Sequence, residues 1–252
     1  MKKLLFPLAL SILIASCSGN STQMRTDLEA ANLKGKVMKV EKKLHNATGK
    51  AVCPGAESMN CNNSVFVYNE KGFLTETSEG DDGGMIMARN EYKYGSDGKL
   101  KEIIKYAGDA IKNRDLNTYE NGLLKEVKVV NDIDSVETIY NYDYNGKDIV
   151  SGRVLNSRGE LISSFKNEIQ NGQIQVQRQF DKEGKEYSVS KFTRNEKNDI
   201  TEYNISTQAT QSEYKVAVEY EYDENGNWIK QTQKFNGEII AIILRTITYY
   251  NS

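Results

Sequence analysis

Residues able to perform acid–base or nucleophilic chemistry are few in this chain, and their spacing forms no familiar site. His45 is the single histidine, in KKLHNATGK, and no serine or cysteine nucleophile motif accompanies it. A Ser-His-Asp or Cys-His mechanism would depend on that one residue as its general base. We therefore expect His45 to be a surface residue near a strand end, and the protein to be non-enzymatic.

The sequence also gives little support for a metal site or for catalysis by carboxylates. Zinc sites need several His or Cys ligands, and EGDDGG at 79–84 lacks the ordered ligand spacing of a calcium-binding loop. The chain has no Walker or dinucleotide-binding glycine pattern, so we expect no metal and no cofactor. A glycoside hydrolase needs only two carboxyl groups about 5–10 Å apart, and that alternative stays open among the plentiful acids.

The first twenty residues, MKKLLFPLALSILIASCSGN, have the layout of a secretory signal. Two lysines precede an apolar run at 4–14, which is too short to span a bilayer because a membrane helix needs about 20 residues. The sequence IASC at 14–17 resembles the lipobox of bacterial lipoproteins. This resemblance implies a signal peptide at 1–16, lipidation of Cys17 and attachment to a membrane through that lipid.

Residues 17–23 form a short polar tether without the acidic cluster that surface-exposed lipoproteins of the Bacteroidota usually carry. We therefore expect an outer-membrane lipoprotein that faces the periplasm, with the cell surface as the alternative. The formal net charge is −2, with no long block of one sign. Nucleic acids require clustered Lys and Arg, so we expect no nucleic-acid partner.

Two covalent features are predicted beyond the tether. Cys53 and Cys61, in CPGAESMNC, are expected to form a disulfide because export leads to an oxidising compartment. Asp134-Ser135-Val136 matches the short O-glycosylation pattern described for exported Bacteroidota proteins, which makes Ser135 a candidate acceptor. A serine that simply begins a strand is the alternative for that position.

The remaining sequence indicates an all-β fold after one short N-terminal helix. Residues 24–33 have helix formers with early acids, and from Lys36 onward the apolar period becomes two. In VETIYNYDY and KVAVEYEYD, for example, tyrosine and valine alternate with acids and asparagine. Such alternation is typical of antiparallel strands with one buried and one wet face. We interpret 24–252 as a single domain, with β-hairpin repeats over about 36–252.

The strands are separated by one recurring device, an aromatic residue followed four positions later by glycine. It occurs as YNEKG, YGSDG, YDYNG, FDKEG and YDENG, starting at Tyr68, Tyr94, Tyr142, Phe180 and Tyr222. Asp or Asn at the first turn position with Gly at the fourth suits a type I turn closed by a left-handed residue. We expect the ring to be the last inward side chain of its strand. Short Asn-Gly turns, as at 121–122, add tight hairpins.

Turns fall about every 12–13 residues, which predicts a long antiparallel meander of about 13–15 strands in tandem hairpins. So long an open sheet would expose its apolar face and two edges. We therefore expect it to curl into a shell or barrel, or to fold into two layers. The last strand, EIIAIILRTITYY, is apolar on both faces and should be central or covered.

FDKEGKE from Phe180 and YEYDENGNWIKQ from Tyr220 resemble the YD repeats of Rhs-type proteins and the tandem-hairpin lipoproteins of Bacteroidota. The resemblance runs from about Lys36 to the C-terminus and implies a β-hairpin repeat fold in the cell envelope. It transfers no active site.

The sequence is compatible with three alternative functions. The first is a non-enzymatic, outer-membrane-anchored module that binds or scaffolds a protein or glycan partner of the envelope. The second is a glycan-binding or glycan-cleaving protein that uses carboxylates and rings such as Trp228, the single tryptophan, for stacking. The third is an Rhs-associated partner or immunity-type protein. For the fifteen tyrosines and Trp228 we favour packing on the sheet over ligand contact.

Overall fold

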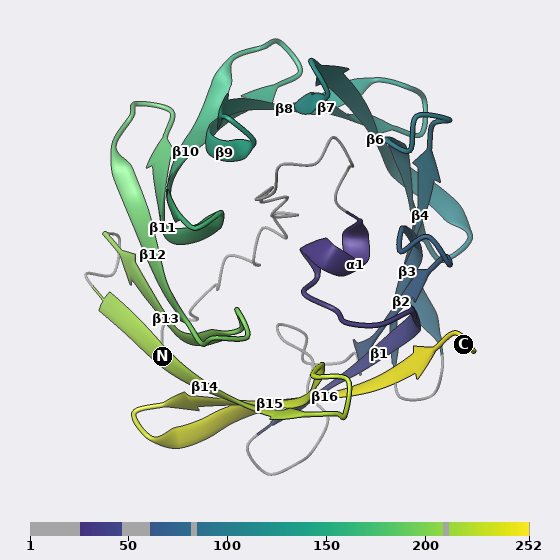
Figure 1. Ribbon diagram of the computed structural model, residues 1–252. Helices are drawn as coiled ribbons and strands as arrows, with labels where there is room; N and C mark the ends of the chain where they lie inside the picture. The colour runs from purple at the N-terminus through teal and green to yellow at the C-terminus, as the bar shows by residue number, and fades with distance from the viewer. Residues whose placement is uncertain (1–25, 47–60, 82–84, 209–211, 252) are drawn as a thin grey trace.

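A computed structural model describes residues 26–46, 61–81, 85–208 and 212–251, and it confirms the all-β prediction. Sixteen antiparallel strands in these ranges form a closed barrel in which each strand pairs with its sequence neighbours (Figure 1). The last strand pairs with the first, so the barrel has no free edge. The strand number is slightly above the expected 13–15. Within the described residues, no helix has the length and apolar character needed to cross a membrane.

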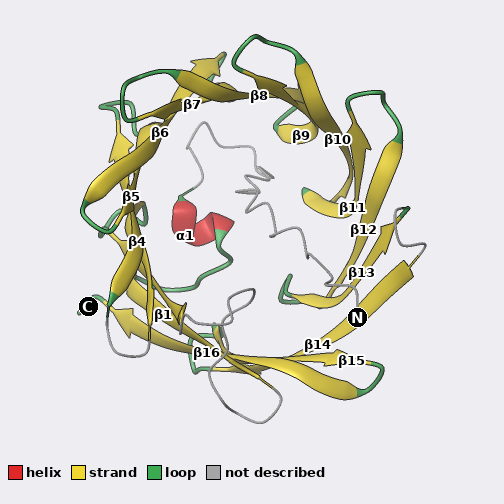
Figure 2. Ribbon diagram, turned by 180° about the vertical axis from the view of Figure 1, so that it is seen from behind, coloured by secondary structure: helices red, strands yellow, loops and turns green. Residues whose placement is uncertain are grey.

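The elements follow the chain in order around the barrel wall (Figure 2). They are α1 (Asp27–Ala30), β1 (Val37–Asn46), β2 (Cys61–Tyr68), β3 (Leu74–Asp81), β4 (Ile86–Tyr94), β5 (Leu100–Ala107), β6 (Ala110–Glu120), β7 (Leu123–Asn131), β8 (Val136–Asn145), β9 (Asp148–Asn156), β10 (Leu161–Gln170), β11 (Gln173–Asp181), β12 (Glu186–Arg194), β13 (Ile200–Thr207), β14 (Ser212–Tyr222), β15 (Trp228–Phe235) and β16 (Glu238–Tyr249).

Helix α1 is shorter than the helix expected at 24–33. Thr26 caps it in a reciprocal arrangement, since its side chain accepts from the Glu29 amide and its own amide donates to the Glu29 carboxylate. Asn32 adopts the left-handed conformation with φ 56° just after the last turn. Because a left-handed residue ends a helix, α1 makes little more than one turn before the chain enters β1.

Asx residues build the hairpin turns as expected. At 223–226, Asp223 Oδ1 accepts from the amides of Asn225 at 3.0 Å and Asn227 at 2.8 Å, and Gly226 has φ +81°. Asn198 supplies the left-handed position of its turn with φ 70°. The short 121–122 turn has positive φ at both residues, as a type I′ hairpin requires.

The two ends of the barrel differ. We call "helix end" the end that holds α1 and the turns at 69–72, 95–98, 195–198 and 223–226. The "far end" holds the turns at 131–134, 156–159 and 181–184.

The inner face is identified by α1, which lies inside the ring of strands in both views (Figures 1 and 2). Leu28 of α1 packs with Leu33, Val37, Val40, Tyr68 and Leu74 in one buried cluster. Val40 pairs with Phe66 on β2 and with Ile247 on β16, and both also pack against this cluster. Following the pairing from this row assigns every strand an inner and an outer face.

One expectation about the turns is wrong for Phe180. The rings before the helix-end turns face inward, as Tyr68, Tyr94 and Tyr222 do, but Phe180 faces outward beside Ser164. Consider a hairpin that is turned over so that its turn moves from one end of the barrel to the other. The face that pointed into the lumen then points outward. Identical turns at the two ends of a meander barrel therefore direct the preceding side chain to opposite faces.

Candidate functional site

The inner wall carries most of the tyrosines. β14 shows how the side chains divide between the inner and outer faces. Val216, Val218 and Tyr220 are buried or half-buried, whereas the alternating Glu219 and Glu221 are exposed. Pairing extends the inner set around the barrel through these tyrosines: Tyr68, Tyr92, Tyr94, Tyr119, Tyr140, Tyr142, Tyr144, Tyr203, Tyr214, Tyr220, Tyr222 and Tyr249. The expectation that tyrosine shares the phase of valine and isoleucine is confirmed.

Many of these hydroxyls have a structural partner. Those of Tyr119, Tyr144 and Tyr220 each donate to a backbone carbonyl oxygen on a neighbouring strand at 2.8–2.9 Å. Burial raises the pKa of Tyr142 and that of Tyr220 to about 12, so both phenols stay protonated at neutral pH. These rings build the wall and present apolar area with a satisfied polar tip.

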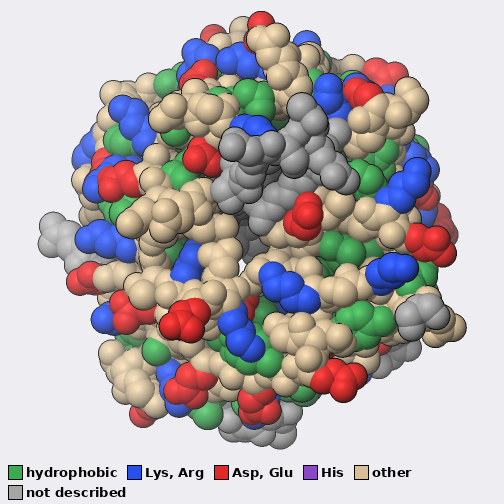
Figure 3. Space-filling model, viewed as in Figure 1, with side chains coloured by type: hydrophobic (Ala, Val, Ile, Leu, Met, Phe, Trp, Pro, Cys, Tyr) green, Lys and Arg blue, Asp and Glu red, His purple; other side chains and the backbone are tan. Residues whose placement is uncertain are grey.

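The outer wall is polar and rich in ion pairs. Lys234 Nζ lies 2.6 Å from the Glu219 carboxylate, and Lys230 Nζ lies 2.7 Å from that of Glu221, both across strands β14 and β15. Further cross-strand pairs lie on the outer face elsewhere: Arg114–Glu102, Lys125–Asp143, Arg178–Glu168 and Lys215–Glu202. A lipid-facing barrel wall instead carries an outward apolar band. Acidic and basic side chains are also intermixed on the face of the molecule that Figure 3 shows.

The lumen is wide because sixteen strands enclose more space than inward side chains can fill. Away from the α1 cluster, most inner residues are half-buried rather than buried. The inner wall is therefore the concave face of the barrel.

Two cations interrupt the inner wall where the first and last strands meet. Lys42 of β1 pairs directly with Arg245 of β16, and the row continues through Ser64 of β2. Lys42 Nζ lies 4.3 Å from the centre of the Phe66 ring, and the Arg245 guanidinium lies 3.2 Å from that of Trp228. Burial, with the neighbouring Arg245 charge, lowers the pKa of Lys42 to about 7.

The sequence reasoning missed both cations, although a signal for them existed. Lys42 alternates in phase with Val40 and Leu44, and Arg245 alternates in phase with Ile243 and Ile247. A cation within the apolar phase of an alternating strand indicates a charge on the buried face.

Helix α1 and the segment after it, residues 27–36, form hydrogen bonds to the barrel wall at the helix end. We call this segment the strap. Asp27 Oδ2 accepts from the Leu74 amide at 2.8 Å and from the Tyr94 hydroxyl at 2.7 Å. Farther along, the Lys34 amide donates to Asn227 Oδ1 at 2.7 Å, and Asn227 Nδ2 donates back to the Lys34 carbonyl at 2.9 Å. The strap therefore bonds to turns on both sides of β1.

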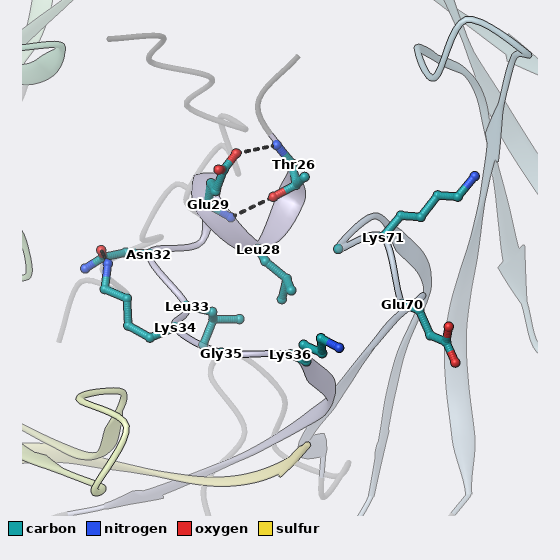
Figure 4. A pocket seen from close by; sticks show the side chains of 11 residues that line it. Thr26, Leu28, Glu29, Asn32, Leu33, Lys34, Gly35, Lys36, Glu70 and Lys71 are labelled. Atoms are coloured by element: carbon teal, nitrogen blue, oxygen red, sulfur yellow. Dashed lines mark hydrogen bonds between the residues drawn. The ribbon is translucent and has the colours of Figure 1, made fainter. Parts of the chain in front are cut away.

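A groove of about 520 Å³ lies between α1 and the β2–β3 turn (Figure 4). Its lining mixes three lysines with two glutamates, namely Lys34, Lys36, Lys71, Glu29 and Glu70. Because these charges are of both signs, the groove favours no ligand of one charge.

The predicted site residues are distributed as follows. Trp228 begins β15 and packs against Tyr220 at 5.8 Å between ring centres, with Arg245 over its face, so the ring is engaged by the protein. Ser135 is exposed in the far-end turn, where its amide donates to Asn131 Oδ1. His45 lies near the end of β1, as expected, but it is half-buried rather than exposed.

The cysteine predictions stay predictions. Cys17 and Cys53 lie outside the described residues, and of Cys61 only its place at the start of β2 is described. In the described ranges, no group of three His, Cys, Asp or Glu side chains is arranged to hold a metal.

No family model and no curated protein matches this chain. Among solved structures, a porin-like protein from Bacteroides uniformis is similar over 85% of this chain and 98% of its own, with 13% identity and a TM-score of 0.58. A porin-like protein from Bacteroides vulgatus is similar over 86% and 99%, with 11% identity and a TM-score of 0.49. A TcdB2–TccC3–Cdc42 complex covers 83% of this chain and 11% of its own, with 13% identity and a TM-score of 0.34.

The second and third similarities, with TM-scores below 0.5, carry no weight, so the Rhs resemblance stays a prediction. The first is a likeness of fold alone, because its identity is low. This chain thus shares a closed antiparallel barrel with the B. uniformis porin-like protein.

Proposed function

We propose that this protein is a lipid-anchored, non-enzymatic binding module of the bacterial cell envelope, whose binding surface is the inner wall of the barrel. The observation that carries the proposal is the division of side chains between two faces. Most tyrosine rings and the cations Lys42 and Arg245, which form no ion pair within the described residues, lie on the inner face, whereas paired lysines and glutamates cover the outside. Ligand sites are concave, apolar surfaces with a few polar groups, and the inner wall fits that description.

The outer wall supports anchoring by lipid rather than by insertion of the barrel. A charged side chain on a lipid-facing wall costs about 2–4 kcal/mol at the bilayer midplane, and this wall carries charges on most strands. A multiply acylated Cys17 would hold such a barrel stably at a membrane face while leaving it in water. We propose the periplasmic side of the outer membrane.

The anchoring is tested by replacing the acylated residue. Cys17→Ala should move the protein from the membrane fraction to the soluble periplasmic fraction, as measured by fractionation and immunoblotting. Cys61→Ala is the control, because it removes another cysteine without removing the proposed lipid. Membrane association of the Cys17→Ala protein equal to that of wild type would contradict the anchor.

The binding surface is tested by screening the purified mature protein against small-molecule and glycan fractions of the envelope, with thermal shift as the readout. A ligand of the lumen should lose affinity in Tyr140→Leu, on the inner face, and keep it in Asn141→Ala, on the outer face. Ligands that respond only to outer-face changes would overturn the proposal. Glycan turnover abolished by a single carboxylate substitution would replace it with the glycan-cleaving alternative.

A further inference from the structure

Lys42 and Arg245 differ from Lys39 of β1, which has a carboxylate partner. Among the described residues, no ion pair and no side-chain hydrogen bond involves either of them, and the Nε atom of Arg245 is buried without a partner. On the outer face of β1, in contrast, Lys39 lies 3.0 Å from Glu41. Both side chains are half-buried. Because it is costly to withdraw a cation from water without a counter-charge, we expect the pair to favour binding of an anion.

None of the neighbouring acids that the structure describes forms an ion pair with Lys42 or Arg245. Asp199 accepts from the Tyr222 hydroxyl at 2.9 Å and from Asn32 at 3.2 Å. Asp27 is bonded to the amide of Leu74 and to the hydroxyl of Tyr94. Glu79 follows Ser64 in the Lys42 row but is exposed and forms no ion pair with Lys42.

The positions of the two cations make their side chains one recognition unit. Directly opposite residues on antiparallel strands hold their Cβ atoms about 5 Å apart, and like charges there repel each other. That repulsion ends when one anionic group accepts from both. Arg245 offers a planar fork suited to carboxylate or phosphate, and Lys42 offers a point charge beside it.

Aromatic rings flank the pair on both sides. Phe66 lies beside Lys42, Trp228 lies beneath Arg245, and Tyr220 packs against Trp228. Charge in the centre with ring faces at the sides suits a molecule that has both an acidic group and a flat apolar body.

We propose that Lys42 and Arg245 bind the acidic group of a small organic anion in the lumen, with Phe66 and Trp228 contacting its apolar body. The inference rests on the proposed function, because it names the ligand class of the same inner wall. Lys42 and Arg245 would each bond the anion directly, and the Arg245 guanidinium would shift from the Trp228 ring as it does so.

Trp228 is the single tryptophan, so its fluorescence reports this site alone. The mature protein is titrated with benzoate, and with benzamide as its neutral counterpart, at constant ionic strength. We expect saturable binding of benzoate and at least about tenfold weaker binding of benzamide, since loss of a charged partner costs more than a factor of ten. Equal affinity for the two probes would overturn the proposal.

Variants assign the effect to residues. Lys42→Met and Arg245→Met should each weaken benzoate binding at least about tenfold, measured by calorimetry because the second change alters the fluorescence itself. Lys43→Met, one residue along β1 on the outer face, should leave binding unchanged. Arg245→Lys retains the charge and should lose less affinity than Arg245→Met. Unchanged binding by Lys42→Met would sink the assignment.

The pH dependence gives a further readout. The titratable side chains around the Lys42–Arg245 pair include Tyr68 of β2, Glu79 of β3, Asp27 of α1 and Asp199, which precedes β13. Since Lys42 loses its proton near pH 7 in the free protein, benzoate affinity should fall as pH rises from 6 to 8 in wild type. In Lys42→Met this decrease should be absent. A slope that survives the substitution would contradict the role of Lys42.

The two proposals fail separately. If neutral envelope ligands require Tyr140 while benzoate does not bind, the anion site is wrong and the lumen remains the binding surface. If neither class of ligand depends on inner-face residues, both proposals are wrong.

Discussion

The helix end and the far end of the barrel use the same turn for different purposes. At the helix end the side chain before the turn points into the lumen, as Tyr94, Arg194 and Tyr222 do. At the far end Leu155 and Phe180 point outward from equivalent positions. A motif that fixes backbone geometry therefore leaves the face of its side chain undecided until the strand direction is known.

The consequence for the molecule is an asymmetric lumen. The helix end gathers rings and polar groups inside, and these bond to α1 and the segment that follows it. The far-end turns bond mainly within themselves, since Asp181 accepts from the amides of its own turn. We expect the stability of the helix end to depend on individual polar side chains, and that of the far end to depend on them much less.

The largest difference is expected at the residue that follows the turn glycine. Asn227 is 2% exposed and holds both the amide and the carbonyl of Lys34. Asn227→Ala leaves buried polar groups unpaired and should lower the free energy of unfolding by about 2–3 kcal/mol. Lys185→Ala, at the equivalent far-end position, should cost less than about 0.5 kcal/mol. Urea unfolding of both variants measures the two losses of stability. Equal losses would contradict the expected difference between the two ends.

The inner and outer faces of β1 should differ in a pH-dependent way. Lys42→Met removes a half-buried cation and should raise the free energy of unfolding by about 1–3 kcal/mol at pH 6. The folded protein releases the Lys42 proton near pH 7 and the unfolded chain near its ordinary pKa of 10.5. Wild-type stability therefore rises with pH across this window, and the advantage of the variant should shrink.

Lys43→Met is the matched control for that change. Its side chain is exposed on the outer face, so the substitution should alter stability by less than about 0.5 kcal/mol and without this pH dependence. Unfolding curves at pH 6, 8 and 10 distinguish the two variants. A pH-independent effect of Lys42→Met would mean that Lys42 keeps its proton in the folded barrel.

A smaller difference is expected at the rings before the turns. The Tyr94 hydroxyl donates to Asp27 and packs within the helix end, and burial followed by the Asp27 charge raises its pKa. Tyr94→Phe should cost about 1–2 kcal/mol because a hydrogen bond to a carboxylate is lost. Phe180→Tyr adds an outward hydroxyl at the far end and should be neutral. Thermal unfolding of the pair tests whether the faces are assigned correctly.

The smallest effect is expected on the outer wall. Lys234→Ala breaks the ion pair with Glu219, whose carboxylate is exposed. Exposed pairs contribute about 0.2–1 kcal/mol and are screened by salt. The loss should therefore be below about 1 kcal/mol at low salt and smaller at high salt. A larger, salt-independent loss would mean that this face is covered in the protein.

Much of the fold was predictable because its information is local. Alternation placed valine and tyrosine on one face, and the Asx-x-x-Gly pattern located turns such as 181–184 and 223–226, where the predicted left-handed glycines occur. The apolar last strand was expected to be central and is, since β16 pairs with both β1 and β15. Strand number was slightly underestimated.

The candidate site was less predictable because it is assembled by closure. Lys42 and Arg245 are 203 positions apart in the numbering and meet only because the first strand pairs with the last. Trp228 was singled out as a stacking ring, yet its partner Arg245 became evident only when β15 and β16 were seen side by side.

By itself, the sequence determined the strand period, the turn chemistry and the hydrophobic phase of each strand, since these depend on residues within a few positions of one another. Only the tertiary structure decided that the ribbon closes, which end of it each turn occupies, and which two cations lie together without a counter-charge. Pairing across the seam and the exchange of faces between the ends are properties of the whole barrel, and no single repeat contains them.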